Sequence, residues 1–424
     1  MSRNKQHSDF DAIARITRLE APWLHAPALE TVFAVLKAGG FEARVVGGAV
    51  RNALLGRPVS DTDIATTSPP EDTMRLARAA GLGVYPTGIS HGTVTVVAHG
   101  TSFEVTSLRH DVETDGRHAV VTFTDDWSAD AKRRDFTINA LYAASDGTIF
   151  DYTEGRNDLA AGRVRFIGDA SARIREDYLR ILRFFRFSAD YGCGVVDAAG
   201  LAACTELKSC MIRLSGERVG AETMKLIVSP RAAEICEVMN HTGILEIVLG
   251  KHGHPERILK LQTIENELAI AAEAIPRLAA LALDTPGEAA EISRKLRLSN
   301  EANAILMATT TPHPALNPNA PERDAKALLY RLGPTAFQRA VQHAWAASNS
   351  PATDSAWHLR YRLAERWSPP RMPFTGADVL ALNVEPGPIV GKVLSEFELW
   401  WSEQNFPSDP ALQKRKLADL VRDG

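Results

Sequence analysis

The chain has 424 residues, of which 45% are apolar and 24% are charged, and these ordinary globular values exclude extensive disorder. The formal net charge of −4 at pH 7 excludes a protein that is basic over its whole surface, but it allows a local basic face. A chain of this length is expected to fold as more than one structural unit.

The cysteines and the first residues indicate a compartment. Cys193, Cys204, Cys210 and Cys236 form no C-x-x-C pair and no zinc-like spacing with histidine, so we expect free thiols in a reducing cytosol. The start of the chain, MSRNKQHSDF, carries no apolar segment, and no stretch approaches the ~20 apolar residues of a membrane helix. We therefore expect a cytoplasmic protein without a membrane partner.

The first third of the chain alternates between helical and extended patterns. Helical spacing predicts a helix at 27–38, and an apolar run predicts a strand at 41–46. Two β-rich segments, 92–97 and 102–106, are separated by four residues and predict a hairpin. Residues 110–130 are polar at their start, and we expect a mobile loop there. These patterns favour a small mixed α/β unit.

Beyond residue 190 the pattern is almost wholly helical, without a convincing alternating strand. Proline-rich segments near residues 311–321 and 367–376 interrupt it, and we expect joints between helical units there.

The stretch from Val45 to Ile64, VVGGAVRNALLGRPVSDTDI, carries the strongest chemical signal. A Gly47-Gly48 turn before a helix lets backbone N–H groups approach a phosphate. Asp61 and Asp63, two apart on an extended segment, point to the same side and can hold a divalent metal together. This combination suggests metal-assisted phosphoryl or nucleotidyl transfer.

Glu104 lies in the middle of the second strand of the expected hairpin, between Phe103 and Val105. Either it faces solvent, or it is a third carboxylate beside Asp61 and Asp63 if the strands adjoin. The residues alone leave both interpretations open.

Residues 171–188, SARIREDYLRILRFFRFS, predict one helix in a basic part of the chain. Asp177, Arg180, Arg183 and Arg186 follow each other at intervals of three along one broad side. A salt-bridged surface stripe would explain this spacing, but aromatic residues interleave with the arginines and an apparent catalytic unit precedes them. A binding role is the alternative.

The edges of the nucleic-acid bases sharpen that alternative. Adenine and cytosine both present an amino donor beside a ring-nitrogen acceptor, whereas guanine and uracil present an acceptor beside an N–H donor. Since a carboxylate accepts and a guanidinium donates, Asp177 with Arg180 could accept A or C and refuse G and U. Arg183 and Arg186 would then hold phosphates or steady the reading pair.

Several motifs in sequence order, GGAVRN…DTD, HGTVTVV, FEVTSLR, KRRDFTINA and EDYLRILRFFRF, resemble the class II tRNA nucleotidyltransferases (CCA-adding enzymes) and the related bacterial poly(A) polymerases. The resemblance covers roughly residues 40–230. It implies an α+β fold, with a polymerase beta-like α/β nucleotidyltransferase head followed by an all-helical neck, body and tail. The expected boundaries are 1–163 for the head, 164–230 for the neck, 231–320 for the body and 321–424 for the tail.

The resemblance also implies roles for individual residues. Gly47, Gly48 and Arg51 would bind the triphosphate, and Asp61 and Asp63 would hold magnesium with Glu104 as the third carboxylate. The nucleotide would further be contacted by Arg134, Asp135 (which would select ribose), Asn139, Asp177, Arg180, Arg183 and Arg186. Glu217 and Arg218 match a helix-stabilising motif behind the site. The family usually has aspartate where this chain has Asn52, and loss of that charge would loosen the orientation of Arg51.

The activity that follows from the resemblance is template-independent addition of CMP and AMP, from CTP and ATP, to the 3′ end of tRNA. Two Mg²⁺ ions would serve the reaction, and the tRNA would lie along the helical body and tail. A poly(A) polymerase, or an enzyme that adds only CC or only A, is the alternative. A more distant alternative is a non-catalytic RNA-binding homologue.

Overall fold

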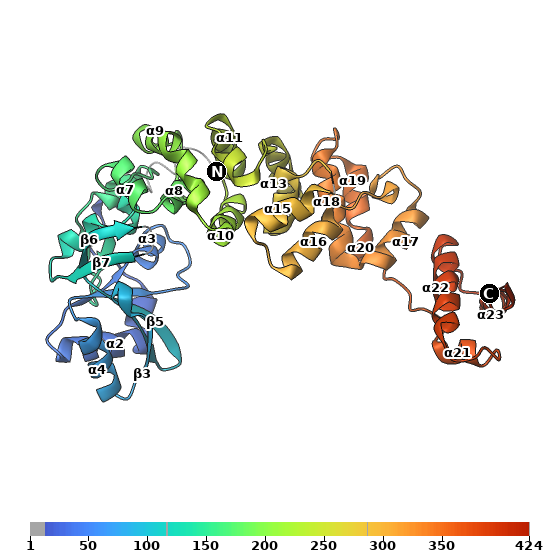
Figure 1. The fold of residues 1–424 in the computed structure, drawn as a ribbon, viewed down its shortest axis with the longest axis horizontal. Coiled ribbons are helices and arrows are strands. Elements are labelled where there is room, and N and C mark those ends of the chain that lie inside the picture. Colours follow the sequence, from blue (N-terminus) through green and yellow to red (C-terminus); the bar gives the residue numbers. More distant parts are fainter. Residues whose placement is uncertain (1–12, 116–117, 286, 424) are drawn as a thin grey trace. The chain divides into compact units, whose positions relative to one another are not determined.

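The computed structural model describes residues 13–115, 118–285 and 287–423, and it divides into two compact units (Figure 1). Of the described residues, those up to 231 and those from 241 to 247 form unit 1, and those from 232 to 240 and from 248 onward form unit 2. None of the helices in the described part of the chain is both long and apolar enough to cross a membrane.

Unit 1 contains a mixed β-sheet in which, among the described residues, seven strands follow the order β3-β4-β5-β2-β1-β8-β9. Only β2 and β5 run parallel, and every other pairing in that sheet is antiparallel. The strands are β1 (Ala43–Val46), β2 (Asp63–Thr66), β3 (Gly83–Gly88), β4 (Thr93–Ala98), β5 (Thr101–Ser107), β8 (Leu141–Ala143) and β9 (Ile149–Asp151).

The helix expected at 27–38 is confirmed. Helix α2 (Pro27–Ala38) ends at Gly39, and with α4 (Pro70–Ala79) it packs on one face of the sheet, because both contact β4 and each other. The expected hairpin is also confirmed, since β4 pairs with β5 across Ala98 and Thr101. Helix α3 (Gly48–Leu54) connects β1 to the approach to β2.

The expected loop at 110–130 is wrong for most of its length. Strands β6 (Arg109–Asp115) and β7 (His118–Phe123) form a two-stranded antiparallel hairpin, and α5 (Trp127–Lys132) follows it. The run of His118 to Phe123 is β-rich, and the polar residues before it masked the strand that it pairs with.

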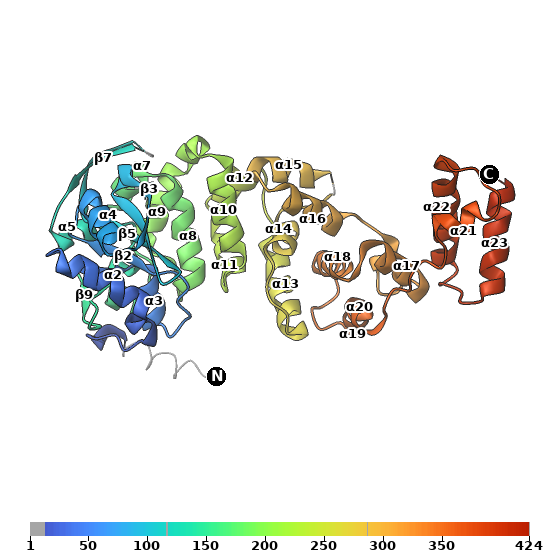
Figure 2. The same ribbon diagram turned by 90° about the horizontal axis from the view of Figure 1, so that it is seen from below.

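The single helix expected at 171–188 is broken in two. Helix α7 (Ala170–Glu176) ends at Asp177, whose backbone is extended with φ −155° and ψ 109°, and α8 (Leu179–Tyr191) starts two residues later. Helix α10 (Gly216–Ile227) packs against α8 (Figure 2). Short segments complete unit 1: η1 (Pro22–His25), η2 (Ile89–His91), η3 (Thr137–Asn139), α6 (Gly155–Ala160), α9 (Ala198–Leu207) and η4 (Lys208–Arg213).

The chain from residue 190 onward is helical wherever it is regular in the described residues, as predicted. Helices α11 (Ala232–His241) and α12 (Ile244–Leu249) lie where the chain passes between the units. Unit 2 continues with α13 (Pro255–Leu268), α14 (Ala274–Ala282), α15 (Glu288–Leu296), α16 (Asn300–Thr310), η5 (Pro314–Leu316), α17 (Glu322–Leu332), α18 (Pro334–Ala347), α19 (Ser355–Tyr361) and α20 (Leu363–Arg366).

Among the described residues, apolar clusters stabilise unit 2, and two of them are prominent. The first runs from Leu261 to Leu363 and is centred on fully buried Phe337 and Trp345. The second joins α21 (Gly376–Leu380), α22 (Pro388–Glu403) and α23 (Pro410–Asp423) through residues such as Phe397. The proline-rich stretch near 367–376 lies between these clusters, whereas the one near 311–321 lies within the first.

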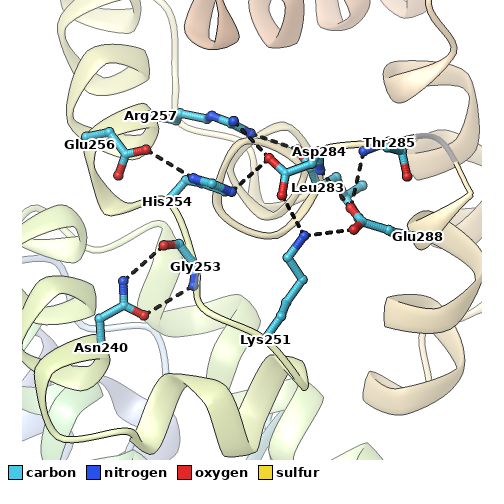
Figure 3. A network of polar contacts seen from close by, with 10 residues as sticks. All are labelled: Asn240, Lys251, Gly253, His254, Glu256, Arg257, Leu283, Asp284, Thr285 and Glu288. Atoms are coloured by element: carbon cyan, nitrogen blue, oxygen red, sulfur yellow. Dashed lines mark hydrogen bonds and ion pairs between the residues drawn. The ribbon is translucent and has the colours of Figure 1, made fainter.

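A polar network ties α13 to the α14–α15 connection (Figure 3). The carboxylate of Asp284 pairs with Lys251 at 2.8 Å, with His254 Nε2 at 2.9 Å and with Arg257 at 2.9 Å. Lys251 also pairs with Glu288 at 2.9 Å. These partners, first among them Lys251, hold the pKa of Asp284 well below its usual value.

Candidate active site

A cavity of about 710 Å³ opens in unit 1 between the β1–α3 turn, the start of β2, residues 133–139, α8 and α10. It is lined by twelve of the thirteen residues that the sequence nominated: Gly47, Gly48, Arg51, Asp61, Asp63, Arg134, Asp135, Asn139, Asp177, Arg180, Arg183 and Arg186. Glu104 is not part of this lining.

The glycine turn brings the backbone into the cavity wall. Gly47 has φ +74°, a conformation that side chains rarely adopt, and its N–H donates to the carbonyl oxygen of Leu141 at 3.0 Å. Gly48 then begins α3, whose first turn and Arg51 also line the cavity. The positive φ at Gly47 therefore turns the chain so that α3 starts at the cavity.

Asn52 retains a contact with Arg51. Its Oδ1 accepts from Arg51 Nε at 3.3 Å and from Nη2 at 3.2 Å. Arg51 also donates to Asn139 Oδ1 and, at 2.8 Å, to the hydroxyl of Tyr191. Uncharged acceptors thus set the orientation of Arg51. We expected that Asn52, in place of the usual aspartate, would loosen that orientation, but these hydrogen bonds indicate that Asn52 still holds the guanidinium.

The three carboxylates come from adjacent strands. Parallel pairing of Ile64 with Val105 puts Asp63 next to Glu104, while Asp61 lies just before β2. Burial, then Glu104, raises the pKa of Asp63, and Asp61 adds to the effect. A cation would relieve the repulsion among these carboxylates, so the three side chains fit a divalent metal.

Among the described residues, however, no three acidic, histidine or cysteine side chains form a ready metal cage. Magnesium is commonly held by one or two carboxylates with the remaining positions filled by water and substrate phosphates. Asp61 and Asp63 in a phosphate-sized cavity match that arrangement.

Arg134, which lines the cavity, is held in place by two neighbours. Its guanidinium pairs with Asp130 at 3.0 Å and donates to the hydroxyl of Tyr142 at 3.1 Å. Burial alone would lower the pKa of Arg134, but Tyr142 and Asp130 outweigh it and raise the pKa. Arg134 is therefore a rigid cation.

Asp135 already accepts four hydrogen bonds, the full capacity of a carboxylate. The donors are the N–H of Phe136 at 2.8 Å, Asn139 Nδ2 at 3.1 Å, and Arg183 through Nε at 2.8 Å and Nη2 at 2.5 Å. Burial raises the pKa of Asp135, but Arg183 and these hydrogen bonds outweigh it and lower the pKa. A ribose hydroxyl could reach Asp135 only by displacing one donor.

The expected base-reading residues are held by other partners. Arg218 donates to Asp177 Oδ2 at 2.6 Å, Arg180 pairs with Glu176, and Arg186 donates to Glu222 Oε2 at 2.6 Å. Asp177 and Arg180 do not pair with each other in the described structure, though both line the cavity. Arg218 is in the cavity wall, so the expectation that it lies behind the site is wrong.

The cavity is strongly cationic. Eight arginine or lysine side chains line it, against four carboxylates, a balance that attracts a polyphosphate. Sequence reasoning did not assign Arg133, Phe187 or Lys225, which also line it, nor Tyr191, which binds Arg51. The KRRD motif and the 183–187 aromatics could have suggested the first two, but no local pattern marks Lys225 or Tyr191.

Comparison with known proteins shows which family models match this chain. The model of the poly A polymerase head domain matches residues 43–165, and the model described as the probable RNA and SrmB-binding site of polymerase A matches residues 196–257. The two models together cover the strands, α3 and much of the helical part of unit 1.

Relatives that match over most of their length and a solved structure agree. The chain is 34% identical to the mitochondrial CCA tRNA nucleotidyltransferase 1 of Danio rerio, over 86% of this chain and 84% of the relative. It is 30% identical to the CCA-adding enzyme of Latilactobacillus sakei, over 88% and 91%. The crystal structure of the Bacillus stearothermophilus CCA-adding enzyme in complex with CTP superposes with a TM-score of 0.74 at 27% identity, covering 94% of this chain and 98% of that one. The chain therefore belongs to the family of CCA-adding tRNA nucleotidyltransferases.

Proposed function

We propose that the protein adds CMP and AMP, from CTP and ATP, to the 3′ end of tRNA without a template. The observation that carries this proposal is a single cationic cavity in which Asp61 and Asp63 share one space with Asp177 and Arg180. One pocket that holds both a carboxylate pair and a base-reading pair suits sequential transfer of two related nucleotides.

Different residues contact the triphosphate, the base and the ribose of the nucleotide. The Gly47-Gly48 turn and Arg51 bind the triphosphate, and Arg134 adds a fixed positive charge. Asp177 accepts from the amino group shared by adenine and cytosine, and Arg180 donates to the neighbouring ring nitrogen. Asp135 meets the ribose hydroxyl after Arg183 or Asn139 releases one of its oxygens.

We propose Mg²⁺ as the cation, held by Asp61 and Asp63 with Glu104 beside them. When bound there, the ion supplies Lewis-acid polarisation of phosphoryl oxygens and lowers the pKa of a hydroxyl. Asp61 and Asp63 would hold that ion, while the arginines of the cavity neutralise the charge of the pyrophosphate that leaves.

We further propose that the head (1–163) and neck (164–230) select the nucleotide, and that the body (231–320) and tail (321–424) bind tRNA. Unpaired cysteines, of which Cys204 and Cys236 are buried, suit a reducing compartment, and we propose the cytoplasm.

The test is to incubate the protein with Mg²⁺, a tRNA lacking its CCA end, and each labelled nucleotide in turn. Addition of two C residues followed by one A supports the proposal. Asp61→Asn is the control for contaminating polymerases, because it removes a proposed metal ligand from an exposed position just before β2 and leaves the core intact.

Other outcomes identify the alternatives. Long A tails on arbitrary RNA would establish a poly(A) polymerase, and arrest after CC or failure to add C would establish a partial enzyme. Absence of incorporation with any nucleotide would contradict all of these activities and favour a non-catalytic RNA-binding protein.

A further inference from the structure

Arg51 is a buried cation whose partners are all uncharged. Arg51 is 6% exposed, and its guanidinium donates to Asn139, to Asn52 and to the hydroxyl of Tyr191. No carboxylate lies within ion-pair distance of its guanidinium in the part of the chain that the structure describes. Burial, together with Arg186, lowers the pKa of Arg51, whereas Tyr191 and, to a smaller extent, the more distant carboxylate of Asp135 oppose that effect.

Tyr191 contacts Arg51 in two ways. The guanidinium lies over the tyrosine ring, 4.0 Å from its centroid, while Nη2 donates to the hydroxyl at 2.8 Å. That hydroxyl donates in turn to Asn52 Oδ1 at 3.2 Å, which also accepts from Arg51 Nη2. Arg51, Tyr191 and Asn52 thus form a closed triangle of hydrogen bonds.

The ring of Tyr191 makes two further contacts. Arg57 lies over the same ring at 4.8 Å and donates to the carbonyl oxygen of Asp190 at 3.0 Å. Phe187 stacks on Tyr191, with ring centroids 5.7 Å apart and an angle of 28° between planes. Since Tyr191 ends α8, the helix that carries Arg183 and Arg186 into the cavity also holds Arg51.

We propose that Tyr191 is a positioning residue that orients Arg51 toward the triphosphate without neutralising its charge. A carboxylate in its place would orient the guanidinium equally well but would cancel part of the attraction for an anion. Burying a cation without a counterion is costly, and an incoming polyphosphate supplies the missing negative charge. The inference rests on the proposed function only where it names the nucleotides as CTP and ATP. Binding of a polyphosphate by Arg51 does not depend on the proposed function.

The first measurement uses inorganic tripolyphosphate and the full-length protein without tRNA. Tyr191→Phe keeps the ring face and removes the hydroxyl, so calorimetric affinity for tripolyphosphate should fall by roughly tenfold, the usual effect of a lost hydrogen bond to a charged group. Tyr191→Leu also removes the cation–π contact and should weaken binding further.

The matched control is Tyr152→Phe. Tyr152 accepts a similar hydrogen bond from Arg44 at 2.9 Å, but it does not line the cavity. The Tyr152→Phe substitution should leave the affinity for tripolyphosphate unchanged.

Steady-state kinetics separate positioning from a merely structural role. Tyr191→Phe should raise KM for CTP and ATP by the same factor and change kcat little, because both nucleotides share the triphosphate. A loss of kcat alone, or wild-type affinity for tripolyphosphate in Tyr191→Phe, would overturn the inference.

Asn52→Asp tests the role of charge. It keeps an acceptor beside Arg51 and adds a negative charge, so it should weaken tripolyphosphate binding in the wild-type background. Tighter or unchanged binding would contradict the inference. A protein that binds tripolyphosphate in a Tyr191-dependent manner but adds no nucleotide to tRNA would overturn the proposed function and leave this inference standing.

Discussion

Asp177 keeps acceptor capacity for a base although it is already ion-paired. Its Oδ1 accepts from the N–H of Leu179 at 3.1 Å, and its Oδ2 accepts from Arg218 at 2.6 Å. Each carboxylate oxygen can accept a second hydrogen bond. Arg218 therefore orients the aspartate that we propose to read the amino group of adenine or cytosine.

We expect Asp177→Ala to relax base choice, so that GTP and UTP are incorporated with at least tenfold less discrimination, the usual value of a base-edge contact. Arg218→Ala should relax base choice to a lesser degree, because Asp177 remains but loses its orientation. Single-nucleotide incorporation assays with all four nucleotides would measure both effects.

Arg213→Ala is the control, because Arg213 lies just before α10 and does not line the cavity. If both cavity variants still refuse GTP and UTP, Asp177 does not read the base edge.

At the level of single residues, motif spacing nominated part of the cavity lining, and the family resemblance added Arg51, Arg134, Asp135 and Asn139. Short-range patterns such as Asp61-x-Asp63 depend on local geometry, and local geometry is what a sequence displays. Tyr191 lies 140 positions from the arginine that it contacts. Nothing local to either residue records that contact, so only the fold could reveal it.

At the level of elements, the break between α7 and α8 shows how a polar side chain can end a helix inside a helical pattern. The carboxylate of Asp177 accepts from the N–H of Leu179, as an N-cap side chain does, and offers the backbone an alternative to continuing the helix. The spacing of three residues predicted a helical stripe that begins with Asp177. The structure instead presents Asp177 from an extended residue and Arg180, Arg183 and Arg186 from the helix.

Short strands were the elements that the sequence least revealed. Strands β8 and β9 have three residues each, too few for an alternation of two residues to stand out. Longer elements such as α2 and the β4–β5 hairpin were predicted correctly, because their periodicity repeats.

Helix α18 carries a histidine that should make the protein sensitive to acid. Burial lowers the pKa of His343 to about 4, with a smaller contribution from Arg257. The unfolded chain therefore takes up a proton near pH 6.5 before the folded protein does, and stability should fall as the pH drops from 6.5 toward 4. The loss should be on the order of 3 kcal/mol.

His343→Gln, which does not titrate, should remove that part of the pH dependence. Denaturant unfolding at pH 7.5 and pH 5 would compare the two proteins. Equal losses of stability in both would show that other groups cause the acid sensitivity.

At the level of the whole molecule, the chain does not divide at one point. Residues 241–247 belong to unit 1 although residues 232–240 belong to unit 2. Ile244 and Leu245 in that returning segment are fully or almost fully buried, and Lys208 donates to the carbonyl oxygen of Thr242. The boundary that we propose between neck and body at residue 230 lies beside the first crossing, and residues 241–247 extend unit 1 beyond it.

A truncated chain ending at residue 249 should therefore be more stable than one ending at residue 231, by about 3–6 kcal/mol for two buried aliphatic side chains. Urea unfolding and tripolyphosphate binding would compare the two chains. Equal stability would indicate that residues 241–247 contribute nothing to unit 1.

The network around Asp284 has a consequence for how unit 2 tolerates mutation. The carboxylate of Asp284 contacts Lys251, His254 and Arg257, so a substitution that removes any one of these side chains leaves the acid with two partners. Loss of the acid leaves all three without it at once. In a deep mutational scan, substitutions at position 284 should thus be depleted more strongly than substitutions at any of its three partners. This asymmetry arises because one acidic side chain contacts all three partners.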